Sequence, residues 1–206
     1  MHTTSAAELA LFPLGNVLFP GGLLGLKVFE ARYLDMVSAC LRERCTFGVV
    51  ALRSGSDVHQ PGGPAVEFES VGVRAELMDV DSEQAGILQI RCRGTHRFKI
   101  QDRHQRGDGL WIAEVQDLPD DEVVAPEPGQ ADCVRGLGNA IQQLESRLVQ
   151  PFITPYRFDD AGWVANRWCE LLPVPQAAKQ KLMELPDPLL RLQLVDDYLR
   201  SKGVIA

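Results

Sequence analysis

The spacing of the cysteines and histidines shows whether this chain could bind a metal ion or form disulfides. The cysteines are Cys40, Cys45, Cys92, Cys133 and Cys169, and the histidines are His2, His59, His96 and His104. They form neither a CxxC pair nor the HExxH arrangement of a zinc site, so no metal site is predicted. An odd number of cysteines indicates reduced, mostly buried thiols. We expect Cys40 and Cys45 to combine core packing with an exposed end rather than to bind a metal together.

Motifs for nucleotide binding and nucleophilic catalysis are also missing from the sequence. There is no GxxxxGK[ST] phosphate loop and no GxSxG elbow. Ser201-Lys202 lies at the C-terminus, where neither burial nor a partner would activate it. Gly136-Leu137-Gly138 lacks a third glycine and a preceding strand, which favours close helix packing or a weak spot over dinucleotide binding. Acidic pairs are interpreted as solvated or capping charge. We therefore predict no cofactor and no enzyme activity.

A basic cluster is the one local anomaly of charge. Six basic residues stand against the single acid Asp102, namely Arg91, Arg93, Arg97, Lys99, Arg103 and Arg106. They are expected on two adjacent strands, where aligned side chains could grip RNA phosphates or an acidic peptide. The alternative is a solvated barrel wall whose charges prevent edge-to-edge aggregation. The formal net charge of −7 disfavours general nucleic-acid binding.

The composition is that of an ordinary globular protein. The chain has 206 residues, 45% hydrophobic and 24% charged, enough to bury a core in one domain or two. No run approaches the ~18 apolar residues of a membrane span, and the first five residues lack the features of a signal peptide. These observations predict a cytoplasmic protein without membrane association.

The first ~118 residues consist mainly of short runs that are β-branched or alternate between apolar and polar residues, separated by Gly and Pro. This pattern is typical of a small β-barrel or β-sandwich. Strands are expected at about Leu9–Leu14, Leu23–Phe29, Thr46–Arg53, Val66–Val80, Gly86–Arg93, His96–Arg106 and Leu110–Leu118. Gly94-Thr95 is a plausible tight connection between two of them, and Gly107-Asp108-Gly109 is a stronger hairpin turn. One helix, Glu30–Arg44, interrupts this half because its apolar residues recur at helical spacing.

The second half is predicted to be helical. Pro119–Gly129 has three prolines and four acids and is the best candidate linker. Cys133, Leu137, Ile141, Leu144 and Leu148 then mark an amphipathic helix. Three further helices are expected, and they begin after Asp159 or Asp160, near Pro175 and after Asp187.

Three segments together resemble one protein family. Leu11–Met36 is similar to the opening of the Lon protease N-terminal domain, with its Phe-Pro-Gly turn. Gly72–Ile100 is similar to a later part, including Arg-Gly-x-x-Arg-Phe, and Leu172–Leu199 resembles the closing helices. The resemblance implies an α+β fold: a PUA-like β-barrel with an inserted helix (residues 1–122), followed by a C-terminal helical subdomain (130–206).

The resemblance also implies a function. In Lon proteases this region helps to select unfolded or tagged polypeptides, whereas the ATPase and the Ser-Lys peptidase follow it. We therefore expect a non-catalytic polypeptide- or protein-recognition module, as an adaptor or chaperone-like factor, with no bound cofactor. The alternative is an RNA-binding PUA-like module that uses the strands of Arg91–Arg106.

The predicted fold and the two predicted functions together suggest candidate binding residues. A groove between barrel and helices, together with pairing at a sheet edge, would hold an extended peptide. The candidates are Phe19, Phe29, Arg32, Arg91, Arg93, Arg97, Trp163 and Trp168. Each also has a structural interpretation: Phe19-Pro20-Gly21 forms a turn, and Glu30 and Arg32 hold the helix on the barrel.

Overall fold

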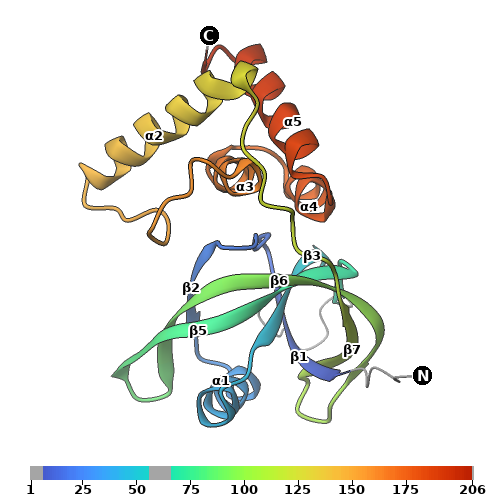
Figure 1. Ribbon diagram of the computed structural model, residues 1–206. Helices are drawn as coiled ribbons and strands as arrows, with labels where there is room; N and C mark the ends of the chain where they lie inside the picture. The colour runs from blue at the N-terminus through green and yellow to red at the C-terminus, as the bar shows by residue number, and fades with distance from the viewer. Residues whose placement is uncertain (1–6, 56–65, 206) are drawn as a thin grey trace. The chain divides into compact units, whose positions relative to one another are not determined.

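The computed structural model describes residues 7–55 and 66–205 of the chain. They divide into two compact units, Met1–Pro119 and Asp120–Ala206. The first unit contains the strands and one helix, and the second contains only helices and their connections (Figure 1). The α+β class expected from the sequence is confirmed.

The strands of the first unit pair in a ring. Their bounds are β1 (Ala7–Leu14), β2 (Leu23–Val28), β3 (Phe47–Ser54), β4 (Glu67–Phe68), β5 (Val71–Gln84), β6 (Ile87–Gln105) and β7 (Trp111–Asp117). The pairings run β1-β7-β6-β5-β3, and β3 pairs in turn with β1 in parallel. β2 joins β6, and β4 joins β3, outside this ring. The sheet is therefore a closed but irregular barrel around a core that includes Leu11, Val50 and Phe98.

The expected turn at Gly94-Thr95 is wrong, because β6 passes through these residues as one long strand. Gly94 instead marks a close approach of backbone: its N–H donates to the Gly22 carbonyl at 2.9 Å, and its carbonyl accepts from the Gly21 N–H at 2.8 Å. A Cβ at Gly94 would lie 2.3 Å from the Phe19 carbonyl oxygen. The sequence does not distinguish a glycine that lets another backbone approach a strand from a glycine that forms a turn.

Two other turn predictions are confirmed. Gly21 has φ 72°, and Gly22 N–H donates to the Phe19 carbonyl at 2.9 Å, which closes the Phe-Pro-Gly turn. Residues 107–109 connect β6 to β7, with Gly109 at φ 85°. Both glycines occupy the left-handed region in which side chains are strained.

Helix α1 (Ala31–Glu43) buries Tyr33, Val37 and Cys40, as their spacing predicts, together with Met36. Leu41, expected on the same face, is 50% exposed. The Phe12 ring of β1 meets the Tyr33 ring edge-on, with centroids 3.9 Å apart. Figure 1 shows α1 at one end of the sheet. The apolar stripe of the helix thus fixes α1 against β1.

The second unit consists of α2 (Ala131–Glu145), α3 (Ala161–Leu171), α4 (Gln176–Glu184) and α5 (Pro188–Ser201), preceded by a 3-10 turn at Pro128–Gln130. Asp160 and Asp187 cap α3 and α5 through their carboxylates, as their positions in the sequence predict. Residues 118–127 form no helix or strand. Within the unit, the Val124 carbonyl accepts from the Ala161 N–H at 2.8 Å, so part of the expected linker packs on the helices.

Candidate functional site

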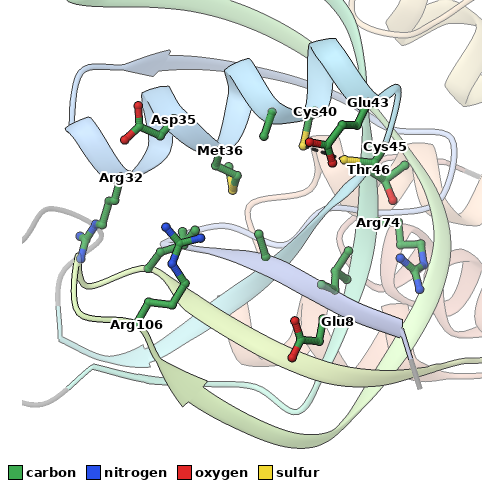
Figure 2. A pocket seen from close by; sticks show the side chains of 14 residues that line it. Glu8, Arg32, Asp35, Met36, Cys40, Glu43, Cys45, Thr46, Arg74 and Arg106 are labelled. Atoms are coloured by element: carbon green, nitrogen blue, oxygen red, sulfur yellow. Dashed lines mark hydrogen bonds between the residues drawn. The ribbon is translucent and has the colours of Figure 1, made fainter. Parts of the chain in front are cut away.

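A cavity of about 570 Å³ lies in the first unit between α1 and β1 (Figure 2). Its volume falls within the range of small-molecule and peptide-side-chain sites. The lining comes from α1, β1, the segment before β3, β5 and the β6–β7 connection. It comprises Glu8, Leu9, Ala10, Arg32, Asp35, Met36, Ala39, Cys40, Glu43, Cys45, Thr46, Arg74, Arg106 and Leu110.

The cavity lies where β1 extends beyond the start of β3. Their parallel pairing starts at Leu11 and Gly48, whereas Ala7–Leu11 pair with β7 on the other side. The edge of Ala7–Ala10 that faces away from β7 therefore has no strand partner within the described ranges 7–55 and 66–205. Cys45 and Thr46, which precede β3, form the opposite wall. An unpaired strand edge beside a cavity is the geometry that accepts an added strand.

Charges of both signs surround this cavity. Arg32 pairs with Glu30 at 2.8 Å and donates from Nη1 to the Gly109 carbonyl at 3.1 Å. Arg74 pairs with Asp117 at 2.7 Å. Among the described residues, the Nε of Arg32 is buried without a hydrogen-bond partner. The arginines are thus positioned by neighbours, and one buried donor in the wall is unsatisfied.

The acids of the lining are less constrained than its arginines. Glu8 and Asp35 form no ion pair with any residue that the structure describes, and Glu43 pairs only with the exposed Arg42 at 3.1 Å. Leu9, Met36 and Cys40 supply a buried apolar floor. The carboxylates at the rim form few ion pairs, whereas the arginines are already paired with acids. A cavity with this rim and an apolar floor is better suited to bind an amphipathic polypeptide than a polyanion.

A smaller pocket of about 100 Å³ lies at the end of β2. It is lined by Phe12, Leu14, Leu26, Lys27, Val28, Phe29, Glu30 and Tyr33. Phe29 is 50% exposed there, so its ring is accessible, as a binding contact must be. The candidates Phe29 and Arg32 therefore line two different pockets.

The other aromatic candidates are buried. Phe19 is 0% exposed, and Trp163 and Trp168 are each 5% exposed, so the expectation that these rings are accessible is not met. The Trp163 ring packs in a cluster with Phe152 and Phe158. Trp168 donates from Nε1 to the Cys133 carbonyl at 3.0 Å. These rings stabilise the cores of their units, because large aromatic side chains contribute much of the energy of a packed core.

The basic candidates are balanced by acids or buried. Arg93 pairs with Glu76 at 2.6 Å, and Arg91 lies opposite Asp79 in the β5–β6 register. Arg97 is 4% exposed and donates to the Pro119 carbonyl at 3.0 Å. Five of the six basic residues lie on β6 and Arg106 directly follows it, so the cluster occupies one strand rather than two. The β5 acids Glu76 and Asp79 lie opposite Arg93 and Arg91. This arrangement supports the solvated-wall interpretation over the RNA-binding one.

The sequence pointed to Arg32 as a binding candidate and to Arg106 as part of the basic cluster, but it gave no signal that the two share a cavity. Glu8, Asp35 and Arg74 come from separate elements and share no spacing that could be recognised along the chain. The described residues also contain no group of three or more Cys, His, Asp or Glu placed to hold a metal ion. None of the described helices is long and apolar enough to cross a membrane.

Comparison with known proteins assigns the fold and the family. Residues 8–201 match the model of the ATP-dependent protease La (LON) substrate-binding domain. The chain belongs to this family. A Lon N-terminal domain protein from Xanthomonas campestris has 32% sequence identity and a TM-score of 0.71, covering 92% of this chain and 96% of its own. The N-terminal domain of a Mycobacterium avium complex Lon protease shares the fold, with 17% identity and a TM-score of 0.63 over 94% of this chain and 98% of its own.

Curated relatives of this Lon substrate-binding domain are longer proteins. Lon protease of Anaeromyxobacter dehalogenans is 26% identical over 97% of this chain and 24% of its own length. Protein cereblon of Danio rerio is 31% identical over 54% of this chain and 25% of its own length. The chain thus spans about a quarter of the relatives it matches. The match to the substrate-binding family model agrees with the resemblance noted in the sequence.

Proposed function

We propose that this Lon substrate-binding domain recognises polypeptide without catalysing a reaction, and that the cavity between α1 and β1 is its binding site. The observation that carries the proposal is the unpaired edge of Ala7–Ala10 beside a cavity of about 570 Å³. An extended segment would pair with this edge through backbone hydrogen bonds, which are independent of sequence. Such a mode suits a module that accepts many unfolded chains.

The cavity lining adds selectivity to this backbone pairing. The floor of Leu9 and Met36 would receive apolar side chains, which contribute most of the affinity of a peptide. Glu8 and Asp35 would attract basic side chains at the rim, where exposed charges affect the association rate more than the affinity. The proposed client is therefore an extended, apolar segment with flanking basic residues.

The proposed site is tested by filling the cavity. Ala39 lies on α1 and lines the cavity, whereas the neighbouring Ser38 is exposed and does not. Ala39→Trp should weaken binding of a fluorescently labelled casein by about tenfold or more, a loss of ~1.4 kcal/mol. Ser38→Trp, a matched control on the same helix, should bind like wild type. Fluorescence anisotropy gives the affinities, and circular dichroism checks that both variants are folded.

The outcomes separate this site from its neighbour. If folded Ala39→Trp binds like wild type while Phe29→Ser binds more weakly, the smaller pocket at β2 is the binding site. If no variant matters because wild type binds no unfolded polypeptide, the recognition function itself is wrong. The absence of catalysis is checked separately, because purified protein should neither hydrolyse ATP nor cleave casein.

A further inference from the structure

The end of α1 brings two cysteines together by backbone geometry. The helix stops at Glu43, and Arg44 follows with φ 52° in the left-handed region. The chain then folds back, and the Cys45 N–H donates to the Cys40 carbonyl at 3.2 Å. A bond between residues five apart is the mark of a Schellman-type helix end. The approach of Cys45 to Cys40 is therefore built into the backbone and does not depend on a flexible side chain.

The two thiols are already in contact. The Sγ of Cys45 donates to the Sγ of Cys40 at 3.6 Å, drawn as a dashed line in Figure 2. Cys40 is buried and Cys45 is exposed, and both line the cavity described above. The other three cysteines are free and buried. An exposed thiol beside a buried one is the arrangement of an attacking and a resolving cysteine.

We propose that Cys40 and Cys45 form a reversible oxidation site that takes a hydroperoxide as its oxidant. The Cys45 thiolate, after loss of its proton to water, attacks the O–O bond of the hydroperoxide, which leaves as an alkoxide or hydroxide, and Cys45 becomes a sulfenic acid. The sulfur of Cys40 then attacks the sulfenic sulfur. The S–O bond breaks, the Cys40 proton joins the departing hydroxide as water, and an intrachain disulfide remains. Overall, two thiols and one hydroperoxide give one disulfide, one alcohol (or water) and one water.

The geometry favours this product over the alternatives. A disulfide has a sulfur separation of about 2.05 Å, so the sulfurs must approach each other by roughly 1.5 Å from their present 3.6 Å. Cys45 lies outside the helix in an exposed turn and can make this movement. Burial raises the pKa of the Cys40 thiol to about 12, which keeps it protonated while solvent reaches Cys45. Cys45 is thus oxidised first, and Cys40 resolves it within the same chain.

The test uses the full chain and hydrogen peroxide. Trypsin cleaves after Arg32, Arg42, Arg44 and Arg53, so Cys40 and Cys45 fall on separate peptides, 33–42 and 45–53. Reduced protein is treated with peroxide, free thiols are blocked, and the digest is examined by mass spectrometry. The expected product is the two peptides joined by a disulfide, with two hydrogen atoms lost. The linked peptides should separate on treatment with dithiothreitol.

Variants of the same pair complete the test. Cys40→Ser, checked for folding by circular dichroism, should accumulate the Cys45 sulfenic acid, which dimedone traps. Cys92→Ser changes a buried thiol that is not paired with Cys45 and should leave the linked peptides unchanged. The proposal is overturned if wild-type Cys45 proceeds to sulfinic or sulfonic acid, or links two chains, without forming the joined peptides. Neither result bears on polypeptide binding, which is measured separately on reduced protein.

Discussion

Arg191 is fully buried in the helical unit, yet its guanidinium is fully engaged. Nε donates to the Leu182 carbonyl at 2.8 Å, and Nη1 donates to the Asn166 side-chain oxygen at 3.1 Å. Nη1 also pairs with Asp121, and Nη2 donates to the Leu185 carbonyl. One side chain thus joins α5 to α3, to the end of α4 and to the segment after Pro119. The buried charge is tolerated here because Nε, Nη1 and Nη2 of the guanidinium each donate to an acceptor.

Removing Arg191 should therefore destabilise the helical unit strongly. Arg191→Leu removes one donor each from Asp121, the Asn166 side chain and two carbonyls, and loss of one partner of a buried pair typically costs about 3–5 kcal/mol. Arg135→Leu is the matched control, because its exposed pair with Asp132 on α2 is worth roughly 0–1 kcal/mol. Urea unfolding followed by tryptophan fluorescence measures both. Equal effects of the two changes would contradict the role assigned to Arg191.

Glu170 is expected to make stability depend on pH. Burial raises the pKa of Glu170 from 4.5 to about 7, although Arg167, paired at 2.9 Å, acts in the opposite direction. The folded state then binds a proton more tightly than the unfolded state. The contribution of this carboxyl to stability is complete below about pH 4.5 and declines as the pH rises through about 7.

Glu170→Gln should remove this component of the pH dependence. The amide oxygen can still accept from Arg167, but the side chain no longer titrates. The measurement is the free energy of unfolding of both proteins at intervals from pH 4.5 to 8. As the pH rises, the free energy of unfolding of wild type should fall relative to that of the variant. A shift in the other direction would show that the attraction of Arg167 outweighs the cost of burying the carboxylate.

At the scale of elements, β6 depends on Gly94 to meet the turn that precedes β2. Gly94→Ala would place a Cβ 2.3 Å from the Phe19 carbonyl oxygen, and overpacking of this kind typically costs about 1–3 kcal/mol. Gly25→Ala on β2 is the control, because a Cβ there meets nothing within 4 Å. Thermal unfolding should show a lower midpoint for Gly94→Ala alone. Two equal midpoints would mean that the turn moves aside without cost.

Removal of the basic charges of β6 distinguishes the polypeptide-binding hypothesis from the RNA-binding hypothesis. Arg97 is buried, so a useful variant changes only the exposed Arg91, Arg93 and Lys99 to Gln. This variant should keep most of its affinity for unfolded polypeptide, because the proposed site lies elsewhere. If wild type binds single-stranded RNA at physiological salt, the variant does not, and no polypeptide binds either, the RNA alternative is right. Titrations at several salt concentrations decide this, since phosphate contacts weaken steeply with salt.

For the molecule as a whole, residues 118–127, which include the boundary of the two units, should be the first point of cleavage. Glu122 and Glu127 are exposed and lie outside helices and strands. A glutamate-specific protease at low concentration should cut there before it cuts within β1–β7 or α1–α5, because exposed backbone without regular hydrogen bonding is most readily cleaved. Mass spectrometry of early fragments is the measurement. Initial cuts within α2–α5 would contradict the boundary, and an intact segment would show that its contacts with the helices protect it.

Much of the fold could be predicted because local patterns carry it. The apolar spacing of Tyr33, Val37 and Cys40 predicted α1, and Asp160 and Asp187 predicted the starts of α3 and α5. These features depend on neighbours in sequence, whose effect is decided by helix geometry and capping. Gly94 was misread because a glycine admits both a turn and a close backbone approach. The choice between them depended on the distant Phe19–Gly22 turn.

The sequence by itself determined the α+β class, the family and the lack of recognised catalytic motifs, because periodicity, capping residues and short motifs are local properties. Tertiary structure alone decided which residues meet. The burial of Phe19, Trp163 and Trp168, the pairing of Arg93 on β6 with Glu76 on β5, and the cavity beside the unpaired edge of β1 all depend on residues far apart in the chain. Long-range packing sets the exposure and partners of a side chain, and no spacing along the sequence encodes them directly.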